Sequence, residues 1–229
     1  MFVLRLTMPR AASTLAFSLA ERGGAGSARE PAIKDKNALM RIVFFGPNGS
    51  GKGTQAALLK AELNVPHIST GDLLRAAVKA GTPLGIKAKA VMEAGKLVSD
   101  EIVLGMLEER LAQADARNGF ILDGYPRNLA QCAALESLLA RIQQPLDIAI
   151  ELHVPDEVIL KRCEIRFRAE HRRDDEPEVV RKRLQVYREQ THPVATHFAD
   201  IGKMATVDGV GEVEEVFKRI MAVLPRVAA

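Results

Sequence analysis

Residues 46–55 read Gly-Pro-Asn-Gly-Ser-Gly-Lys-Gly-Thr-Gln, a segment that very few folds accommodate. An apolar run suited to a β-strand, residues 42–45, precedes it, and a helical pattern of apolar residues follows it from Gln55 to Leu63. Strand, glycine-rich turn and helix in this order are typical of a phosphate-binding loop. The backbone N–H groups and the helix N-terminus attract phosphate oxygens, and Lys52 can reach β- and γ-phosphates. We therefore predict a nucleoside triphosphate site; the alternative is a glycine-rich turn that binds nothing.

One position departs from the general motif, which places Ser or Thr directly after the lysine. Gly53 occupies that place here, and Thr54 follows it. We therefore expect either that Thr54 or its neighbourhood helps to place a metal ion, or that water and phosphate hold the ion.

Composition excludes several classes of protein. Of the 229 residues, 47% are hydrophobic and 27% are charged, as in ordinary globular chains that bury a full core. No apolar run approaches the ~20 residues of a membrane-spanning helix, so we expect no membrane partner. Cys132 and Cys163 lie far apart without a Cys-x-x-Cys pattern, which argues against a disulfide framework and a four-cysteine zinc site. We expect both to be small buried residues.

The formal net charge of +3 arises in residues 1–39, where six basic residues face three acidic ones. The rest of the chain is balanced, so we expect no nucleic-acid partner. Residues 1–20 contain two arginines and no acid, which fits a transit peptide. The alternative is that Met40 is the natural start and that the leader is upstream sequence, and we prefer it because the leader is only weakly amphipathic. In either case the folded domain is expected at residues 40–229.

Strand and helix patterns alternate along the rest of the chain. They predict five strands, at residues 42–45, 65–69, 119–123, 148–154 and 204–207. Helices are predicted between them, including residues 84–94, 99–116 and 212–223, and a long helix after Pro177 that is interrupted at Pro193 and has Tyr187 on its core side. This order predicts an α/β fold of three layers, in which helices cover both faces of a five-stranded parallel sheet, as in P-loop nucleoside triphosphate hydrolases.

Two further features point to phosphate chemistry. Asp123 ends an apolar strand, and in open α/β sheets that end faces the ligand, so Asp123 is a candidate to hold a hydrated magnesium ion. The alternative for Asp123 is a turn aspartate without a partner. Seven arginines are concentrated between the fourth and fifth strands: Arg162, Arg166, Arg168, Arg172, Arg173, Arg181 and Arg183. A solvated charge run is the usual explanation, but beside a phosphate loop we interpret them as phosphate ligands.

Five motifs in this order resemble those of the adenylate kinases, a family of nucleoside monophosphate kinases, over residues 41–224. They are Gly-Pro-Asn-Gly-Ser-Gly-Lys-Gly-Thr-Gln, His-Ile-Ser-Thr-Gly-Asp-Leu-Leu-Arg, Gly-Lys-Leu-Val-Ser-Asp-Glu, Gly-Phe-Ile-Leu-Asp-Gly-Tyr-Pro-Arg-Asn, and Arg-x-Asp-Asp. The resemblance implies reversible phosphoryl transfer from ATP to AMP, giving two ADP, with Mg²⁺ as cofactor. The alternatives are a UMP/CMP kinase and a non-catalytic nucleotide-binding switch.

The resemblance also assigns the site residues. The ATP side comprises Gly49, Ser50, Gly51, Lys52, Gly53, Thr54, Arg162, Arg166 and Gly211. The AMP side comprises Thr70, Arg75, Lys96, Leu97, Val98, Gly124, Tyr125, Pro126, Arg127, Gln131, Arg172 and Arg183. The catalytic cations are Lys52, Arg127, Arg166, Arg172 and Arg183. The hydroxyl of Thr70 and the amide of Gln131 favour adenine over a pyrimidine.

Two mobile parts are implied, an AMP-binding region at residues 69–98 and a short lid at residues 165–175. The lid lacks the insert that holds a zinc cluster in some relatives, so we expect no zinc. Ile165 and His171 occupy positions where the family usually has glycine, which bears on how freely the lid moves. A monomer in the cytoplasm is expected, or an organellar protein if residues 1–39 are a transit peptide.

Overall fold

The computed structural model describes residues 40–93, 98–171 and 173–225. The predictions on the leader, on Lys96, on Leu97 and on Arg172 therefore lie outside the described residues. Among the residues that are described, no helix is long and apolar enough to cross a membrane.

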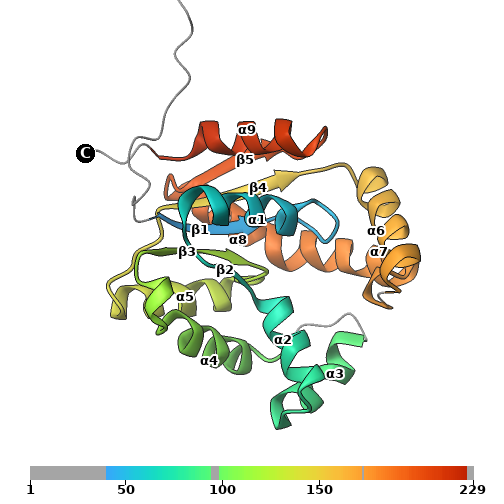
Figure 1. The fold of residues 1–229 in the computed structure, drawn as a ribbon, viewed down its shortest axis with the longest axis horizontal. Coiled ribbons are helices and arrows are strands. Elements are labelled where there is room, and N and C mark those ends of the chain that lie inside the picture. The colour runs from blue at the N-terminus through green and yellow to red at the C-terminus, as the bar shows by residue number, and fades with distance from the viewer. Residues whose placement is uncertain (1–39, 94–97, 172, 226–229) are drawn as a thin grey trace, which may run out of the picture. The chain divides into compact units, whose positions relative to one another are not determined.

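A single parallel sheet lies at the centre of the described chain (Figure 1). Its strands are β1 (Met40–Phe45), β2 (His67–Ser69), β3 (Gly119–Asp123), β4 (Ile148–His153) and β5 (Met204–Asp208). They are ordered β2-β3-β1-β4-β5, so β1 is central. In register, Phe44 pairs with Asp123 and Phe45 pairs with Glu151. The end of β1, where the glycine-rich segment begins, therefore lies directly beside the end of β3.

The second strand is shorter than the run predicted from residue 65. Pro66 lacks an N–H group and cannot donate to a sheet ladder. Its carbonyl accepts a hydrogen bond from the N–H of Ile121, and the strand itself begins at His67.

Helices connect the strands and cover both faces of the sheet. They are α1 (Lys52–Leu63), α2 (Thr70–Lys79), α3 (Pro83–Glu93), α4 (Asp100–Leu111), α5 (Leu129–Arg141), α6 (Asp156–Glu170), α7 (Pro177–Val186), α8 (His192–Asp200) and α9 (Val213–Val223). Short 3-10 turns are η1 (Ala114–Ala116) and η2 (Arg173–Asp175), and η3 (Tyr187–Thr191) is a π-helical turn.

Alternate residues of β1 face opposite layers, as the period of a strand requires. Val43 and Phe45 belong to a core that includes residues of α4, α5 and α8, whereas Ile42 and Phe44 belong to a core that includes residues of α1 and α9. The sheet is thus buried on both sides. The predicted α/β fold, with three layers and a five-stranded parallel sheet, is confirmed.

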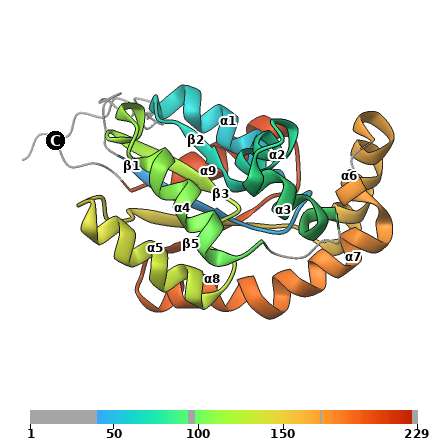
Figure 2. The same ribbon diagram turned by 90° about the horizontal axis from the view of Figure 1, so that it is seen from below.

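Two helical pairs lie beyond the carboxyl ends of the strands (Figures 1 and 2). The first is α2 with α3, which follows β2, and α3 contacts η2. The second is α6 with α7, whose own small core includes Ile159, Cys163, Val180 and Leu184. Cys132 and Cys163 are both buried free thiols, as predicted. The divisions at residues 69–98 and 165–175 stay predictions.

The segments α7, η3 and α8 follow one another without a break in the chain. The predicted interruption at Pro193 takes the form of the π-helical turn just before it, in which the N–H of His192 donates to the carbonyl of Tyr187. A proline has no N–H for the carbonyl four residues earlier, here that of Glu189, and its ring crowds that carbonyl. A wider turn relieves both problems, so Pro193 provides a physical reason for η3.

Candidate active site

The glycine-rich segment folds into a tight loop between β1 and α1. Gly46 has a φ of 132°, and a side chain there would place its Cβ 2.7 Å from Oγ of Ser50. Gly49 has a φ of 89°, and its Cβ would lie 2.8 Å from Sγ of Cys163. Both positions therefore require glycine.

Lys52 is the first residue of α1, and its side chain folds back over this loop. Its Nζ donates to the carbonyl oxygens of Gly46, at 2.7 Å, and Pro47, at 3.0 Å. Burial, opposed by Asp123 and aided by the charges of Arg127, Arg183 and Arg166, lowers the pKa of Lys52 to about 8. An anion bound nearby would raise this pKa again, as expected of a lysine that serves a phosphate.

Asp123 lies at the end of β3, beside the start of the loop. Burial by itself raises the pKa of its carboxyl, but the neighbouring His67 and the charges of Lys52 and Arg127 hold that pKa below its usual value. The Nε2 of His67 lies 3.6 Å from Oδ2 of Asp123. A buried carboxylate that stays ionised is a suitable oxygen ligand for Mg²⁺ or for its bound water.

Arg127 is held by the turn that follows β3. Its Nε donates to the carbonyl of Gly124 at 2.6 Å, and its backbone N–H donates to Oε1 of Gln131 at 2.7 Å. The hydroxyl of Thr70 donates to the same Gly124 carbonyl at 3.0 Å. Burial, together with the charge of Arg183, lowers the pKa of Arg127 to about 10.

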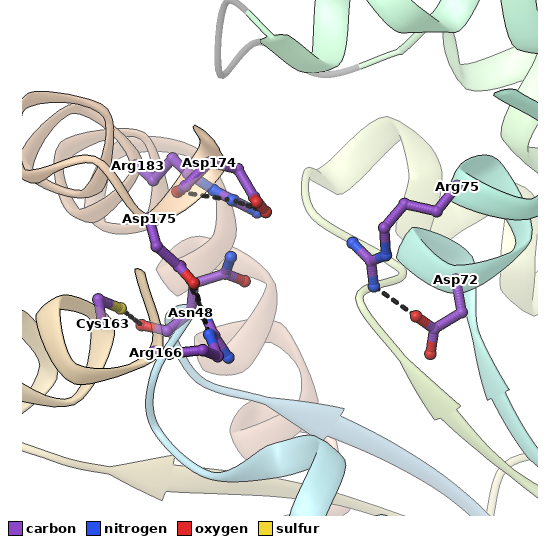
Figure 3. A network of polar contacts seen from close by, with 8 residues as sticks. All are labelled: Asn48, Asp72, Arg75, Cys163, Arg166, Asp174, Asp175 and Arg183. Atoms are coloured by element: carbon purple, nitrogen blue, oxygen red, sulfur yellow. Dashed lines mark hydrogen bonds and ion pairs between the residues drawn. The ribbon is translucent and has the colours of Figure 1, made fainter. Parts of the chain in front are cut away.

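Three further arginines approach the site from two sides, each with a carboxylate partner (Figure 3). Arg166 binds Asp175 through two nitrogens at 2.5 and 2.6 Å, and this pair raises the pKa of Arg166. Arg183 donates to Oδ2 of Asp174 at 3.0 Å, and Arg75 pairs with Asp72 on α2. A carboxylate offers oxygens much as a phosphate does, so these guanidinium groups already bind anions, and Arg166 does so in the bidentate geometry.

These side chains share one cavity of about 390 Å³. The predicted residues that line it are Gly49, Gly51, Lys52, Gly53, Thr54, Arg75, Asp123, Gly124, Pro126, Arg127, Arg166 and Arg183. The structure therefore brings the loop, Asp123 and four arginines together around one space.

Other predicted residues that the structure describes do not line this cavity: Ser50, Thr70, Val98, Tyr125, Gln131, Arg162 and Gly211. Gln131 is 1% exposed, and its Nε2 donates to Oδ1 of Asp100 at 2.6 Å. Arg162 donates to the carbonyl oxygens of Ser50, at 3.3 Å, and Gly209, at 3.1 Å. These two side chains hold the loop and the Arg127 turn from outside the cavity.

The cavity residues that the sequence prediction did not name as site residues include His67, Asp174, Tyr187 and Thr191. Tyr187 was expected on the core side of its helix. One sequence signal could have identified two of them: Tyr187 and Thr191 are four residues apart and lie just before Pro193, which interrupts the helix.

The sequence profile of the adenylate kinases matches residues 44–203 of the chain. The chain belongs to the adenylate kinase family. The adenylate kinase of Xanthomonas campestris pv. campestris (strain B100) is 62% identical over 187 residues, which cover 82% of this chain and 100% of that relative. The adenylate kinase of Stenotrophomonas maltophilia (strain R551-3) is 57% identical over 185 residues, 81% of this chain and 99% of the relative. The predictions of an adenylate kinase and of an enzyme are confirmed.

Proposed function

We propose that the cavity binds ATP and AMP together and transfers the terminal phosphoryl group of ATP to the phosphate of AMP, giving two ADP in a reversible reaction. The observation that carries this proposal is the convergence of Lys52, Arg127, Arg166 and Arg183 on one cavity beside a phosphate-binding loop. The similarity to proteins named adenylate kinases favours this reaction over a UMP/CMP kinase and over a non-catalytic switch.

To catalyse this transfer, the protein mainly has to supply positive charge and hold the two nucleotides in position. The accepting oxygen of AMP is already anionic at neutral pH, because the second pKa of a phosphate is about 6. What opposes transfer is the repulsion between two polyanions, roughly 4 kcal/mol for each pair of charges at ~4 Å and an effective dielectric of 20. Fixed cations offset this repulsion, and a single arginine finger contributes about 10³ to 10⁵ in rate.

We assign each side of the cavity to one nucleotide. The loop N–H groups of residues 49–54, with Lys52 and Arg166, hold the ATP phosphates, while Arg162 supports the loop and Gly211 lies near adenine. Arg75, Arg127 and Arg183 hold the AMP phosphate. The remaining AMP contacts that we propose are Gly124 and Pro126, which line the cavity. They also include Thr70, Val98, Tyr125 and Gln131, which AMP would reach beyond the cavity lining, and Lys96, Leu97 and Arg172.

A magnesium ion that arrives with ATP would meet Asp123, whose buried, ionised carboxylate fits that role directly or through water. When bound, the ion supplies positive charge to the β- and γ-phosphates. Thr54 lines the same cavity and offers a hydroxyl. We further propose a short lid without zinc, a monomer without nucleic-acid or membrane partners, and a cytoplasmic location, or an organellar one if the leader is a transit peptide.

The replacement Arg127→Ala tests this assignment. We expect ADP formation from ATP and AMP to fall by about 10³ or more, because the arginine acts on charge that develops during transfer. The matched control is Arg141→Ala, since Arg141 forms an exposed ion pair with Glu108. A coupled assay with AMP, CMP and UMP in turn also separates the alternative acceptors. Near-normal turnover by a folded Arg127→Ala protein would contradict the assignment.

A further inference from the structure

The π-helical turn η3 contributes two polar side chains, Tyr187 and Thr191, to the wall of the cavity. Such wide turns are rare, and they occur often at functional sites. Neither residue belongs to the set of cations that the proposed reaction uses.

Thr191 holds the backbone of Arg127. Its Oγ1 donates to the carbonyl oxygen of Arg127 at 2.9 Å, across 64 positions of sequence, and Thr191 is 8% exposed. The N–H of Arg127 is held on its other side by Gln131, and its Nε donates to the carbonyl of Gly124. Because hydrogen bonds hold the peptide groups on both sides of Arg127, its guanidinium extends into the cavity from a fixed stretch of backbone.

Tyr187 is anchored beside the start of the phosphate loop. Its hydroxyl donates to Oε1 of Glu151 at 2.7 Å, and Tyr187 and Gly46 line the same cavity. Glu151 lies on β4, in register with Phe45, the last residue of β1. The carbonyl of Gly46 in turn accepts from Nζ of Lys52. The phenol thus ties η3 to β4 at the position beside Phe45, which directly precedes Gly46 and its contact with Lys52.

We propose that Tyr187 and Thr191 are positioning residues, and that η3 keeps the phosphate loop and Arg127 in register with each other. This inference rests on the proposed function, because it concerns the distance between donor and acceptor phosphates. The two anchors leave the same turn of helix, so their separation is set by hydrogen-bonded backbone. A misplacement of about 1 Å in such a site can lower the rate by about 10².

The decisive variant is Thr191→Val, which keeps the shape of the side chain and removes its donor. We expect kcat to fall about tenfold or more, while KM for ATP changes by less than about twofold, because Arg127 acts mainly in the transition state. Thr191→Ser should recover most of the rate, since it restores the hydroxyl. The matched control is Thr196→Val on α8, whose exposed hydroxyl bonds only its own helix, at the carbonyl of His192; it should keep wild-type kinetics.

A second variant tests the coupling. Tyr187→Phe should also lower kcat, and the double variant with Thr191→Val should lose less than the product of the two single losses, because both act through one turn. The melting temperature of each protein is measured beside its kinetics. If Thr191→Val does not fold, Thr191→Ala takes its place.

Three results would overturn the inference: a folded Thr191 variant without the hydroxyl that keeps wild-type kcat, a Ser variant as slow as Val, or single losses that multiply. Failure of the proposed function looks different, because then the wild-type protein itself forms no ADP from ATP and AMP.

Discussion

The ammonium group of Lys52 is buried close to several arginines, and the pKa of about 8 reflects both facts. A lysine is mainly charged below its pKa, so above pH 8 the free enzyme loses the cation that we propose faces the triphosphate. Bound ATP brings negative charge, which raises the pKa again.

The pH profile of the reaction should show this. We expect kcat/KM for ATP to fall as the pH rises through about 8, and kcat itself to fall only at a higher pH, because kcat reports the enzyme with nucleotide bound. Lys52→Arg provides the control, since a guanidinium stays charged in this range, so its kcat/KM should lack the alkaline limb even if its rate is lower. A wild-type kcat/KM that is flat to pH 9.5 would rule out this account of Lys52.

The helix α6 ends in an unusual way. Its C-cap is His171, with a φ of 52° and an N–H that donates to the carbonyl of Phe167. The left-handed conformation at a helix C-terminus is usually taken by glycine, because a Cβ is crowded there. The sequence resemblance likewise leads one to expect glycine at this position.

His171→Gly should therefore stabilise the protein by about 0.5 to 1 kcal/mol, which is the relief of left-handed strain less the greater entropy of an unfolded glycine. Urea unfolding measures this change. Gln143→Gly is a matched control, because Gln143 has a φ of 58° outside the lid region. Both variants should gain stability, but only His171→Gly should change kcat. A loss of stability in His171→Gly would mean that its side chain has contacts worth more than the strain.

The described domain contains a complete parallel sheet and the cavity at its edge. The curated relatives are covered over all or nearly all of their length by 185 to 187 residues of this chain. The first 39 residues carry the whole net charge of +3. The described residues that line the cavity all come from residue 44 onward.

A protein of residues 40–229 should accordingly have the kcat and the melting temperature of the full chain, because it retains every strand and every cavity residue that the structure describes. A second truncation that starts at Gly46 is the control. It lacks β1, which pairs with both β3 and β4, and it should not fold. Lower activity in the 40–229 protein would show that the leader contributes to the domain.

Much of this protein can be read from local sequence. Glycines that must adopt positive φ, the cluster of arginines and the alternation of strand and helix patterns identify the phosphate loop, the three-layer sheet and most of the cavity cations. Each of these depends on neighbours within a few positions, through backbone geometry or side-chain periodicity. The interruption of the long helix after Pro177 could also be predicted, because Pro193 disturbs the hydrogen bonding of the turn before it.

Other features depend on contacts between distant parts of the chain. Gln131 turns to Asp100, 31 positions away, Thr191 reaches Arg127 across 64, and Arg162 supports Ser50 across 112. A hydrogen bond of this kind forms only where two elements of the fold come into contact. A local sequence pattern does not predict which elements will be in contact. The residue types therefore predicted a phosphate site, whereas the fold determined which side chains line the cavity and which hold those side chains in place.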